Sequence, residues 1–252
     1  MPTIDLNADL GESFGAWRMG RDAEMLDIVT SANIACGFHA GDPAEMARTV
    51  GLCLAKGVGI GAHPGFDDLQ GFGRRQITGT SPEALGAMII YQIGALQAIA
   101  TAEGADLRHV KMHGALSNMC MTDRPMADVF ARAVRRLSDD LVIMAVAATE
   151  IEHAALAAGG PLVREVFADR TYNDDGTLVS RSQPGAVIHD AAQAADHVLR
   201  MVEDQAITSI NGLKVPVRPE TICVHGDNPE AVRLAAKVRE RLEGAGVTVA
   251  RF

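Results

Sequence analysis

The chain has 252 residues, 48% of them hydrophobic, and a formal net charge of −9. This length suits one large domain or two small ones, and the apolar content can fill a substantial core. An acidic chain without a block of Lys or Arg is a poor partner for nucleic acid or for an anionic membrane surface.

Strand-like and helix-like segments alternate along most of the chain. Apolar and β-branched runs predict strands, in chain order, at residues 3–8, 32–36, 58–62, 110–112, 141–146, 162–167 and 221–225. Helices are predicted between them, at residues 22–29, 43–56, 82–104 and 191–205. Three more are predicted by one end only: one begins after Asp123, one ends at Ala158 and the last begins after Asn228. This order predicts an α/β fold, a (β/α)7–8 barrel formed as one domain over residues 1–252.

Two segments depart from the alternation. Residues 207–210 and 213–217 flank Asn211-Gly212, a pair typical of a type I′ turn, so a small β-hairpin is expected near 207–217. The short run at 247–250 is a candidate for an eighth strand that closes the barrel.

Polar clusters follow the predicted strands. They lie at residues 5–12, 35–42, 61–65, 110–114, 167–170 and 224–227. In a parallel β/α fold the carboxyl ends of all strands lie on one face, where the loops build the active site. These clusters should therefore meet in one pocket, which is the pattern of an enzyme.

The first cluster places polar side chains two residues apart. Asp5, Asn7 and Asp9 share one face of a strand and should point into the barrel. Buried polar groups cost free energy unless they have partners or a task. We expect Asp9 and Glu12 to be catalytic and Asn7 to bind substrate, whereas Asp5 is expected to be structural. A hydrogen-bond network that fixes the first loop is the alternative.

Two histidines follow neighbouring strands, His39 after the second and His63 after the third. With Asp9 they could form a two-histidine, one-carboxylate metal site. They could instead act as general acid and base. Nothing matches the H-E-x-x-H pattern, so the sequence leaves the presence of a metal unknown.

Lys111 and His113 share one face of the fourth predicted strand. A buried Lys is costly unless it meets a carboxylate or an anionic substrate. We predict that both residues are catalytic and that Lys111 stabilises an oxyanion or a phosphate. An ion pair between Lys111 and Asp9 or Glu12 is compatible with that role.

The candidates for substrate binding are mostly charged. The glycine-rich loop 71–75 carries Arg74 and a second arginine, which could clamp a carboxylate or phosphate, or could be ordinary surface residues. Asp169 and Arg170 end the sixth strand. His225 precedes a helix start, where backbone N–H groups favour an anion. No Walker-type G-x-x-x-x-G-K-[ST] motif occurs.

Cysteine usage and the first residues indicate a cytoplasmic protein. The cysteines form no C-x-x-C pair and are expected to be reduced thiols. Residues 1–5 do not have the features of an export signal. The apolar stretch 85–100 contains Gln92 and Gln97, so we expect a buried helix and not a membrane span.

Four of the clusters together resemble the LamB/YcsF family, in order and across essentially the whole chain. They are Asp5-Leu-Asn-Ala-Asp-Leu-Gly-Glu12, Asn33-Ile-Ala-Cys-Gly-Phe-His-Ala-Gly-Asp42, Gly61-Ala-His-Pro-Gly-Phe-Asp-Asp68 and Asp169-Arg-Thr-Tyr172. One motif departs from the family: its usual Lys-Pro-His-Gly-Ala-Leu-Tyr-Asn is here Lys111-Met-His-Gly-Ala-Leu-Ser-Asn118. Met112 and Ser117 therefore bear on substrate selectivity.

The resemblance implies a function and partners. The family is the A subunit of the bacterial ATP-hydrolysing 5-oxoprolinase, with a distorted barrel like that of glycoside hydrolases and polysaccharide deacetylases. It implies opening of the 5-oxoproline (pyroglutamate) lactam to L-glutamate, with ATP, as its Mg²⁺ complex, hydrolysed to ADP and phosphate. It also implies partner subunits B and C, and a homo-oligomer is a further expectation.

We expect distinct roles for the charged residues of the pocket. An arginine of the 71–75 loop or Arg170 holds the substrate carboxylate, and Lys111 neutralises oxyanion or phosphate charge. Asp9 or one of the two histidines, His39 or His63, activates water. Two alternatives stay open: a metal-dependent, deacetylase-like hydrolase that acts without ATP, and a non-catalytic subunit that positions its partners.

Overall fold

The computed structural model describes residues 2–252 as a closed barrel of parallel strands. The barrel closes because β9 pairs with both β6 and β1. In order of pairing the seven strands are β1 (Thr3–Leu10), β2 (Ser31–Ala35), β3 (Gly59–His63), β4 (Leu107–Val110), β5 (Val142–Val146), β6 (Leu162–Phe167) and β9 (Thr221–Cys223). The predicted α/β barrel is thereby confirmed.

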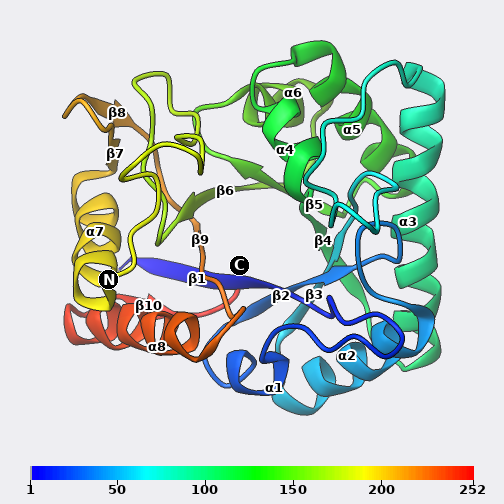
Figure 1. Cartoon of the computed structure of the whole chain (residues 1–252), viewed down its shortest axis with the longest axis horizontal. Helices are drawn as coiled ribbons and strands as arrows, with labels where there is room; N and C mark the ends of the chain where they lie inside the picture. Colours follow the sequence, from blue (N-terminus) through cyan, green and yellow to red (C-terminus); the bar gives the residue numbers. More distant parts are fainter. Residues whose placement is uncertain (1) are drawn as a thin grey trace.

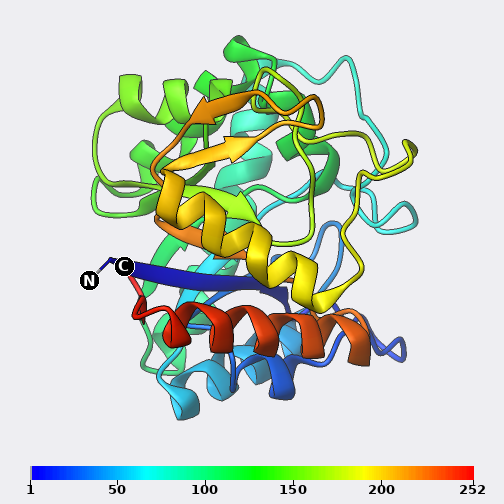
Figure 2. The same cartoon turned by 90° about the vertical axis from the view of Figure 1, so that its left-hand side faces the viewer.

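Helices surround the barrel, as the view along it shows (Figure 1). They are α1 (Asp22–Met25), α2 (Pro43–Lys56), α3 (Pro82–Ala102), α4 (Gly114–Cys120), α5 (Arg124–Leu137), α6 (Glu150–Ala158), α7 (Ala191–Asp204) and α8 (Pro229–Gly244). In the side view α7 and α8 lie side by side beneath a short two-stranded ribbon (Figure 2).

Side-chain caps set the start of the long helices. The carboxylate of Asp42 accepts a hydrogen bond from the backbone N–H of Glu45, three residues into α2. The residues that cap α3, α5, α7 and α8 in the same way are Ser81, Asp123, Asp190 and Asn228. These caps are the signals that the sequence carries, because each satisfies an N–H that has no partner inside its helix.

The strand β1 separates an apolar face from a polar face. Its even-numbered residues, Ile4 to Leu10, belong to the hydrophobic core between strands and helices. The odd-numbered residues Asp5 and Asn7 are buried as well and bond to side chains of β2 and β9. The period of two therefore directs the polar groups of β1 into the barrel, as expected.

Several elements differ from the prediction, and three of these differences concern the site or its surroundings. The helix expected over 22–29 is a single turn, Asp22–Met25. The fourth strand ends at Val110, so Lys111 and Met112 lie just beyond it. The helix α4 was not predicted, because His113 and Gly114 lead straight from the strand end into a helix without a side-chain cap.

Two predictions for the segments after α7 were also wrong, one about a turn and one about the last strand. The hairpin is present as β7 (Ala206–Thr208) and β8 (Lys214–Pro216), but its turn is not type I′. That type needs a positive φ at both central residues, and of the Asn211-Gly212 pair only Gly212 has one, at 83°. The last strand, β10 (Thr248–Val249), pairs with the first two residues of β1 and is not an eighth barrel strand, since β9 closes the ring.

Within the described residues, α3 is the one helix long and apolar enough to cross a membrane by length and composition. It packs against α2, α5, β3 and β4. Its residues Leu85, Ile89 and Leu96 are buried, whereas Tyr91 is 63% exposed. The helix therefore covers the barrel with one face and is less completely buried than the sequence predicted.

Candidate active site

A cavity of about 510 Å³ opens at the carboxyl ends of the barrel strands. Its lining comes from segments that follow β1, β3, β4, β6 and β9. The predicted site residues that line it are Asp9, Glu12, His63, Arg74, Lys111, His113, Arg170 and His225. The remaining predicted residues, Asn7, His39 and Asp169, are not part of the lining. Clusters scattered over more than two hundred residues thus converge on one cavity.

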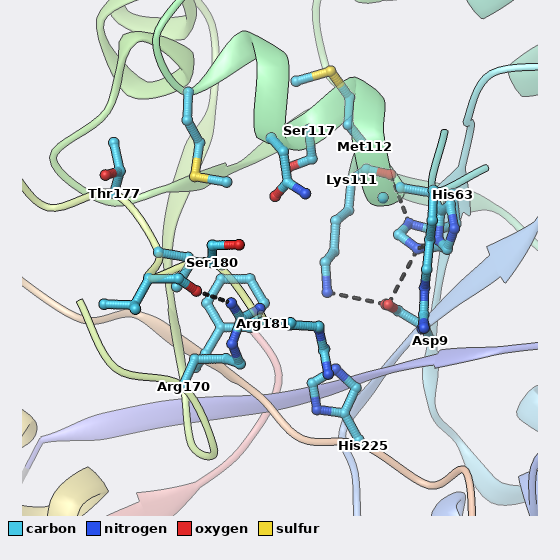
Figure 3. A pocket seen from close by; sticks show the side chains of 18 of the residues that line it. Asp9, His63, Lys111, Met112, Ser117, Arg170, Thr177, Ser180, Arg181 and His225 are labelled. Carbon is cyan, nitrogen blue, oxygen red and sulfur yellow. Dashed lines mark hydrogen bonds and ion pairs between the residues drawn. The ribbon is translucent and has the colours of Figure 1, made fainter. Parts of the chain in front are cut away.

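Lys111 lies at the base of this cavity with its ammonium group buried (Figure 3). Its Nζ is 3.0 Å from Asp9 Oδ1 and 2.8 Å from Glu165 Oε1. It also donates to Asn7 Oδ1 at 3.2 Å and lies 3.1 Å from Cys223 Sγ. Burial lowers the pKa of Lys111, but the charges of Asp9, Cys223 and Glu165 outweigh it and raise that pKa well above its ordinary value. The lysine is therefore a fixed positive charge.

Asp9 lies between Lys111 and His63 (Figure 3). Its Oδ1 faces Lys111, and its Oδ2 is 3.2 Å from His63 Nε2. Burial by itself raises the pKa of Asp9, but the charges of His63 and Lys111 bring it well below the ordinary value. The carboxylate thus stays ionised and reaches the cavity, as a base or a nucleophile-orienting group must.

Asp5 has a structural role, because it links neighbouring strands of the barrel. Its carboxylate accepts hydrogen bonds from the hydroxyls of Ser31 and Thr221 on the two flanking strands. Asn7, one step further along β1, donates to Thr221 Oγ1 at 2.8 Å and accepts from Asn33 at 2.8 Å. The network therefore joins β1 to β2 and β9 and fixes the position of Asn7 under Lys111.

Three histidines and Glu12 form a compact group beside Asp9. One ligand atom from each of Glu12, His39, His63 and His113 lies within 4.8 Å of all the others. The rings of His39 and His113 stack at 3.7 Å, and His63 is edge-on to both. The metal set expected from the sequence combined His39 and His63 with Asp9. In the structure Asp9 contacts His63 at 3.2 Å, and Glu12 lies 3.8 Å from both His39 and His113.

The group is electrostatically unusual. Burial lowers the pKa of His39 well below its ordinary value, and it lowers the pKa of His113 to about 3. Burial also raises the pKa of Glu12 well above its ordinary value, and the charges of Asp9 and Asp227 add to this effect. Such shifts are typical of functional sites, and here they leave uncharged groups next to the ionised Asp9.

Two exposed arginines, Arg74 and Arg181, and the buried Arg170 line the cavity. Arg74 lies over the ring of Phe72, with 5.1 Å from its guanidinium carbon to the ring centroid. Arg75, the second arginine of that loop, is instead engaged by Asp68. Arg170 is buried and donates to the carbonyl oxygen of Val179 at 2.6 Å. Arg74 is therefore the better candidate for an anionic substrate group, and Arg170 can offer only those N–H groups that do not donate to the carbonyl oxygens of Val179 and Ala186.

Asp169 and His225 pair across the carboxyl ends of β6 and β9, with 2.9 Å between Asp169 Oδ2 and His225 Nδ1. Burial opposes the charge on His225, but Asp169 raises its pKa above the ordinary value. The pair fixes the position of His225, which lines the cavity, whereas Asp169 does not line it. Asp169 accordingly supports the site from outside the lining.

Several residues of the site were not predicted from the sequence, among them three that are charged or contact Lys111. Glu165 and Cys223 contact Lys111 from β6 and β9. A carboxylate inside the strand predicted at 162–167 was an available signal for Glu165. Arg181 lines the cavity from the long loop between β6 and α7, where no pattern marks it.

The two residues that depart from the family motif lie at the site as well. Met112 and Ser117 both line the cavity, on the segment that runs from the end of β4 into α4. A substrate in the cavity would therefore meet both side chains.

Comparison with known proteins agrees with this geometry. The model of the LamB/YcsF family matches residues 4–252. A protein of Rhodopseudomonas palustris (strain BisB18), named as the A subunit of 5-oxoprolinase, is 52% identical over 252 residues, which are 100% of this chain and 99% of that protein. The crystal structure of the lactam utilization protein from Thermus thermophilus superposes with a TM-score of 0.93 at 46% identity, covering 99% of this chain and 100% of the other.

A more distant similarity concerns the fold alone. The catalytic domain of a peptidoglycan N-acetylglucosamine deacetylase from Eubacterium rectale superposes with a TM-score of 0.50 at 9% identity, over 99% of this chain and 88% of that chain. The barrel is thus of the kind found in deacetylases.

Proposed function

This chain belongs to the LamB/YcsF family, and on that premise we propose that it is the A subunit of an ATP-hydrolysing 5-oxoprolinase. In this proposal it opens the 5-oxoproline lactam to L-glutamate while ATP is hydrolysed to ADP and phosphate. Curated relatives that carry the name of this subunit support the proposal. The observation that carries it is the fixed Lys111–Asp9 pair in a cavity lined by arginines.

The coupling to ATP follows from the chemistry of the substrate. A five-membered lactam is stable to water, because its amide is a poor electrophile with a poor leaving group. Transfer of the γ-phosphoryl group to the carbonyl oxygen makes the ring carbon electrophilic. One water then adds to that carbon, the C–N bond breaks and the nitrogen takes up a proton. A second water releases phosphate, so that glutamate, ADP and phosphate result.

The residues of the cavity suit these steps. Arg74 or Arg170 would hold the carboxylate of 5-oxoproline, since guanidinium groups bind carboxylates through paired hydrogen bonds. Lys111 would offset the charge that develops on the carbonyl or phosphoryl oxygens. The ionised Asp9, or a histidine beside it, would accept the proton of the attacking water.

ATP, as its Mg²⁺ complex, and the partner subunits B and C belong to the proposal. Because the sequence has no Walker-type motif, ATP is bound either by an unusual site in this cavity or by the partners. The arginines that line the cavity favour phosphate groups as well as carboxylates.

The test is glutamate release from 5-oxoproline, with and without ATP, by this chain alone and together with its B and C partners. Release that requires both ATP and the partners supports the proposal. Absence of glutamate under every condition, with phosphate release also absent, rejects it.

A second candidate function is a metal-dependent hydrolase that acts without ATP. The Glu12 and histidine group favours it, since such residues ligate zinc in many hydrolases. Amide hydrolysis of acetylated substrates that persists without ATP and disappears in His39→Ala would favour this candidate over the first.

A further inference from the structure

We propose that Glu12, His39, His63 and His113 bind one divalent transition-metal ion of the zinc class. This ion is additional to the proposed function, and its binding can be tested on the isolated chain. The four residues come from segments after β1, β2, β3 and β4, which the barrel brings together.

Backbone carbonyl groups fix the protons on two of the rings. His63 Nδ1 is 2.8 Å from the carbonyl oxygen of Lys111, and His113 Nε2 is 2.8 Å from that of Phe72. A carbonyl oxygen only accepts, so each of these nitrogens carries the ring proton. The other nitrogens, His63 Nε2 and His113 Nδ1, are then free to offer a lone pair.

In neutral rings these two nitrogens carry no proton, yet they face each other at 3.1 Å, and Asp9 Oδ2 lies 3.2 Å from the same His63 Nε2. Two lone pairs at this distance repel, unless a cation or an extra proton lies between them. A ring proton donated to a backbone carbonyl is also the usual arrangement of histidines that ligate a metal, because it orients the ring and raises its basicity.

His39 provides an independent observation. Its side chain is fully buried, and neither of its ring nitrogens has a hydrogen-bond partner within the described part of the chain, residues 2–252. A buried polar nitrogen without a partner costs about 1–3 kcal/mol. The side chain is closely packed, since a Cβ at Gly65 would lie 2.8 Å from His39 Nδ1 and a Cβ at Gly73 would lie 2.7 Å from the His39 Cβ. A metal ion would supply the missing partner.

The spacing suits a single ion. Glu12 Oε1 is 3.8 Å from both His39 Nε2 and His113 Nδ1. Ligands about 2.0–2.2 Å from a tetrahedral zinc ion are separated by roughly 3.3–3.6 Å. The contacts of 3.1 and 3.8 Å are close to this value, and the ligand atoms all lie within 4.8 Å of one another, so the more distant ones must draw in. His39 and His113, now parallel, must tilt apart, because a histidine binds a metal near its ring plane.

The donor set indicates the class of metal. Three imidazoles and one carboxylate suit Zn²⁺, Co²⁺ or Fe²⁺ better than Mg²⁺ or Ca²⁺, which prefer oxygen ligands. Glu12, His63 and His113 also line the cavity, so the ion would be open to a substrate carbonyl oxygen.

The experiment measures metal content directly. The folded chain is stripped with a chelator, incubated with Zn²⁺ or Co²⁺, passed through a desalting column and analysed for bound metal. We expect one ion per chain and visible absorption bands of Co²⁺ that report nitrogen ligands. His39→Gln and Glu12→Gln should each weaken binding by about 10-fold or more. His153→Ala should bind normally, because His153 is an exposed histidine that also faces a carboxylate, Glu150.

Less than about a tenth of an ion per folded wild-type chain would overturn the inference, whatever the variants do. Nitrogen-15 NMR of the histidine rings identifies the alternative in that case. Resonances of an imidazolium at His63 or His113 would show that a shared proton, and not a metal, bridges the 3.1 Å gap. The glutamate assay with partners is independent of this result, so the two proposals can fail separately.

Discussion

Replacing Lys111 by Met should destabilise the protein strongly, because it leaves two buried carboxylates without their cation. Lys111 Nζ lies 3.0 Å from Asp9 and 2.8 Å from Glu165. At an effective dielectric constant of about 20, each contact corresponds to roughly 5–6 kcal/mol of attraction, which desolvation of the ions largely offsets. Removal of one partner of such a buried group costs about 3–5 kcal/mol.

The measurement is the free energy of unfolding from denaturant titration at pH 8. The matched control is Lys214→Met, since Lys214 also meets a carboxylate, Asp204 at 2.9 Å, but is exposed. We expect the control to cost less than about 1 kcal/mol. Adding Glu165→Gln to Lys111→Met should restore part of the loss, because it removes one of the two stranded charges.

The cost of Lys111→Met should also depend on pH. Burial raises the pKa of Glu165, and loss of the neighbouring ammonium raises it further. A carboxyl group whose pKa is higher in the folded than in the unfolded protein does not destabilise the fold at a pH below its unfolded-state pKa. Above that pH it lowers the free energy of unfolding progressively, until the pH reaches its folded-state pKa. The variant should therefore recover stability as pH falls from 8 to 5. If Lys111→Met costs no more free energy of unfolding than Lys214→Met, and its cost does not change with pH, then the ion pairs of Lys111 do not stabilise the protein in this way.

Three further predictions concern the framework of the site. Tyr172→Phe should cost about 1–3 kcal/mol in denaturant unfolding, because the buried N–H of Phe167 donates to the Tyr172 hydroxyl at 2.7 Å; an unchanged unfolding midpoint would contradict this. Gly61→Ala should destabilise by more than about 1 kcal/mol in thermal melts, since its Cβ would lie 2.1 Å from His109, whereas Gly51→Ala in open space on α2 should be neutral or stabilise by up to about 1 kcal/mol. Equal melting temperatures for the two glycine variants would count against the packing described. Asp169→Asn should lower the free energy of unfolding most between about pH 4 and 6.5, where Asp169 is ionised and His225 is protonated. The cost should shrink at higher pH, because the stability that comes from the raised pKa of His225 is lost as the pH rises through that pKa. A cost that grows with pH would oppose this assignment.

The fold was largely predictable because its signals are local. Caps such as Asp42 and Ser81 satisfy N–H groups within three residues, and the alternation on β1 sorts polar from apolar side chains directly. The elements that were predicted wrongly depend on distant parts of the chain. The turn at Asn211 and the short pairing of β10 depend on neighbouring strands, and α4 begins without a cap.

The sequence predicted which residues lie in the site better than it predicted which of them contact one another. Parallel strand ends must converge, so Asp9, His63 and Lys111 could be placed in one pocket from their positions alone. Which carboxylate meets which cation depends on barrel register and side-chain depth. That is why Glu165 was missed as a partner of Lys111, and why Glu12 was not expected beside His39 and His113, whereas Asp9 does contact His63 as expected.

One comparison of variants shows whether the Asp9 and Lys111 pocket performs the lactam chemistry. Complexes with the B and C partners are assembled with the wild-type chain, with Asp9→Asn or with the exposed control Asp27→Asn, and ATP-dependent glutamate release is measured. We predict that Asp9→Asn lowers turnover about 100-fold or more in an intact complex, while Asp27→Asn does not change it. Full turnover with Asp9→Asn would contradict the account and identify this chain as a component that only positions its partners.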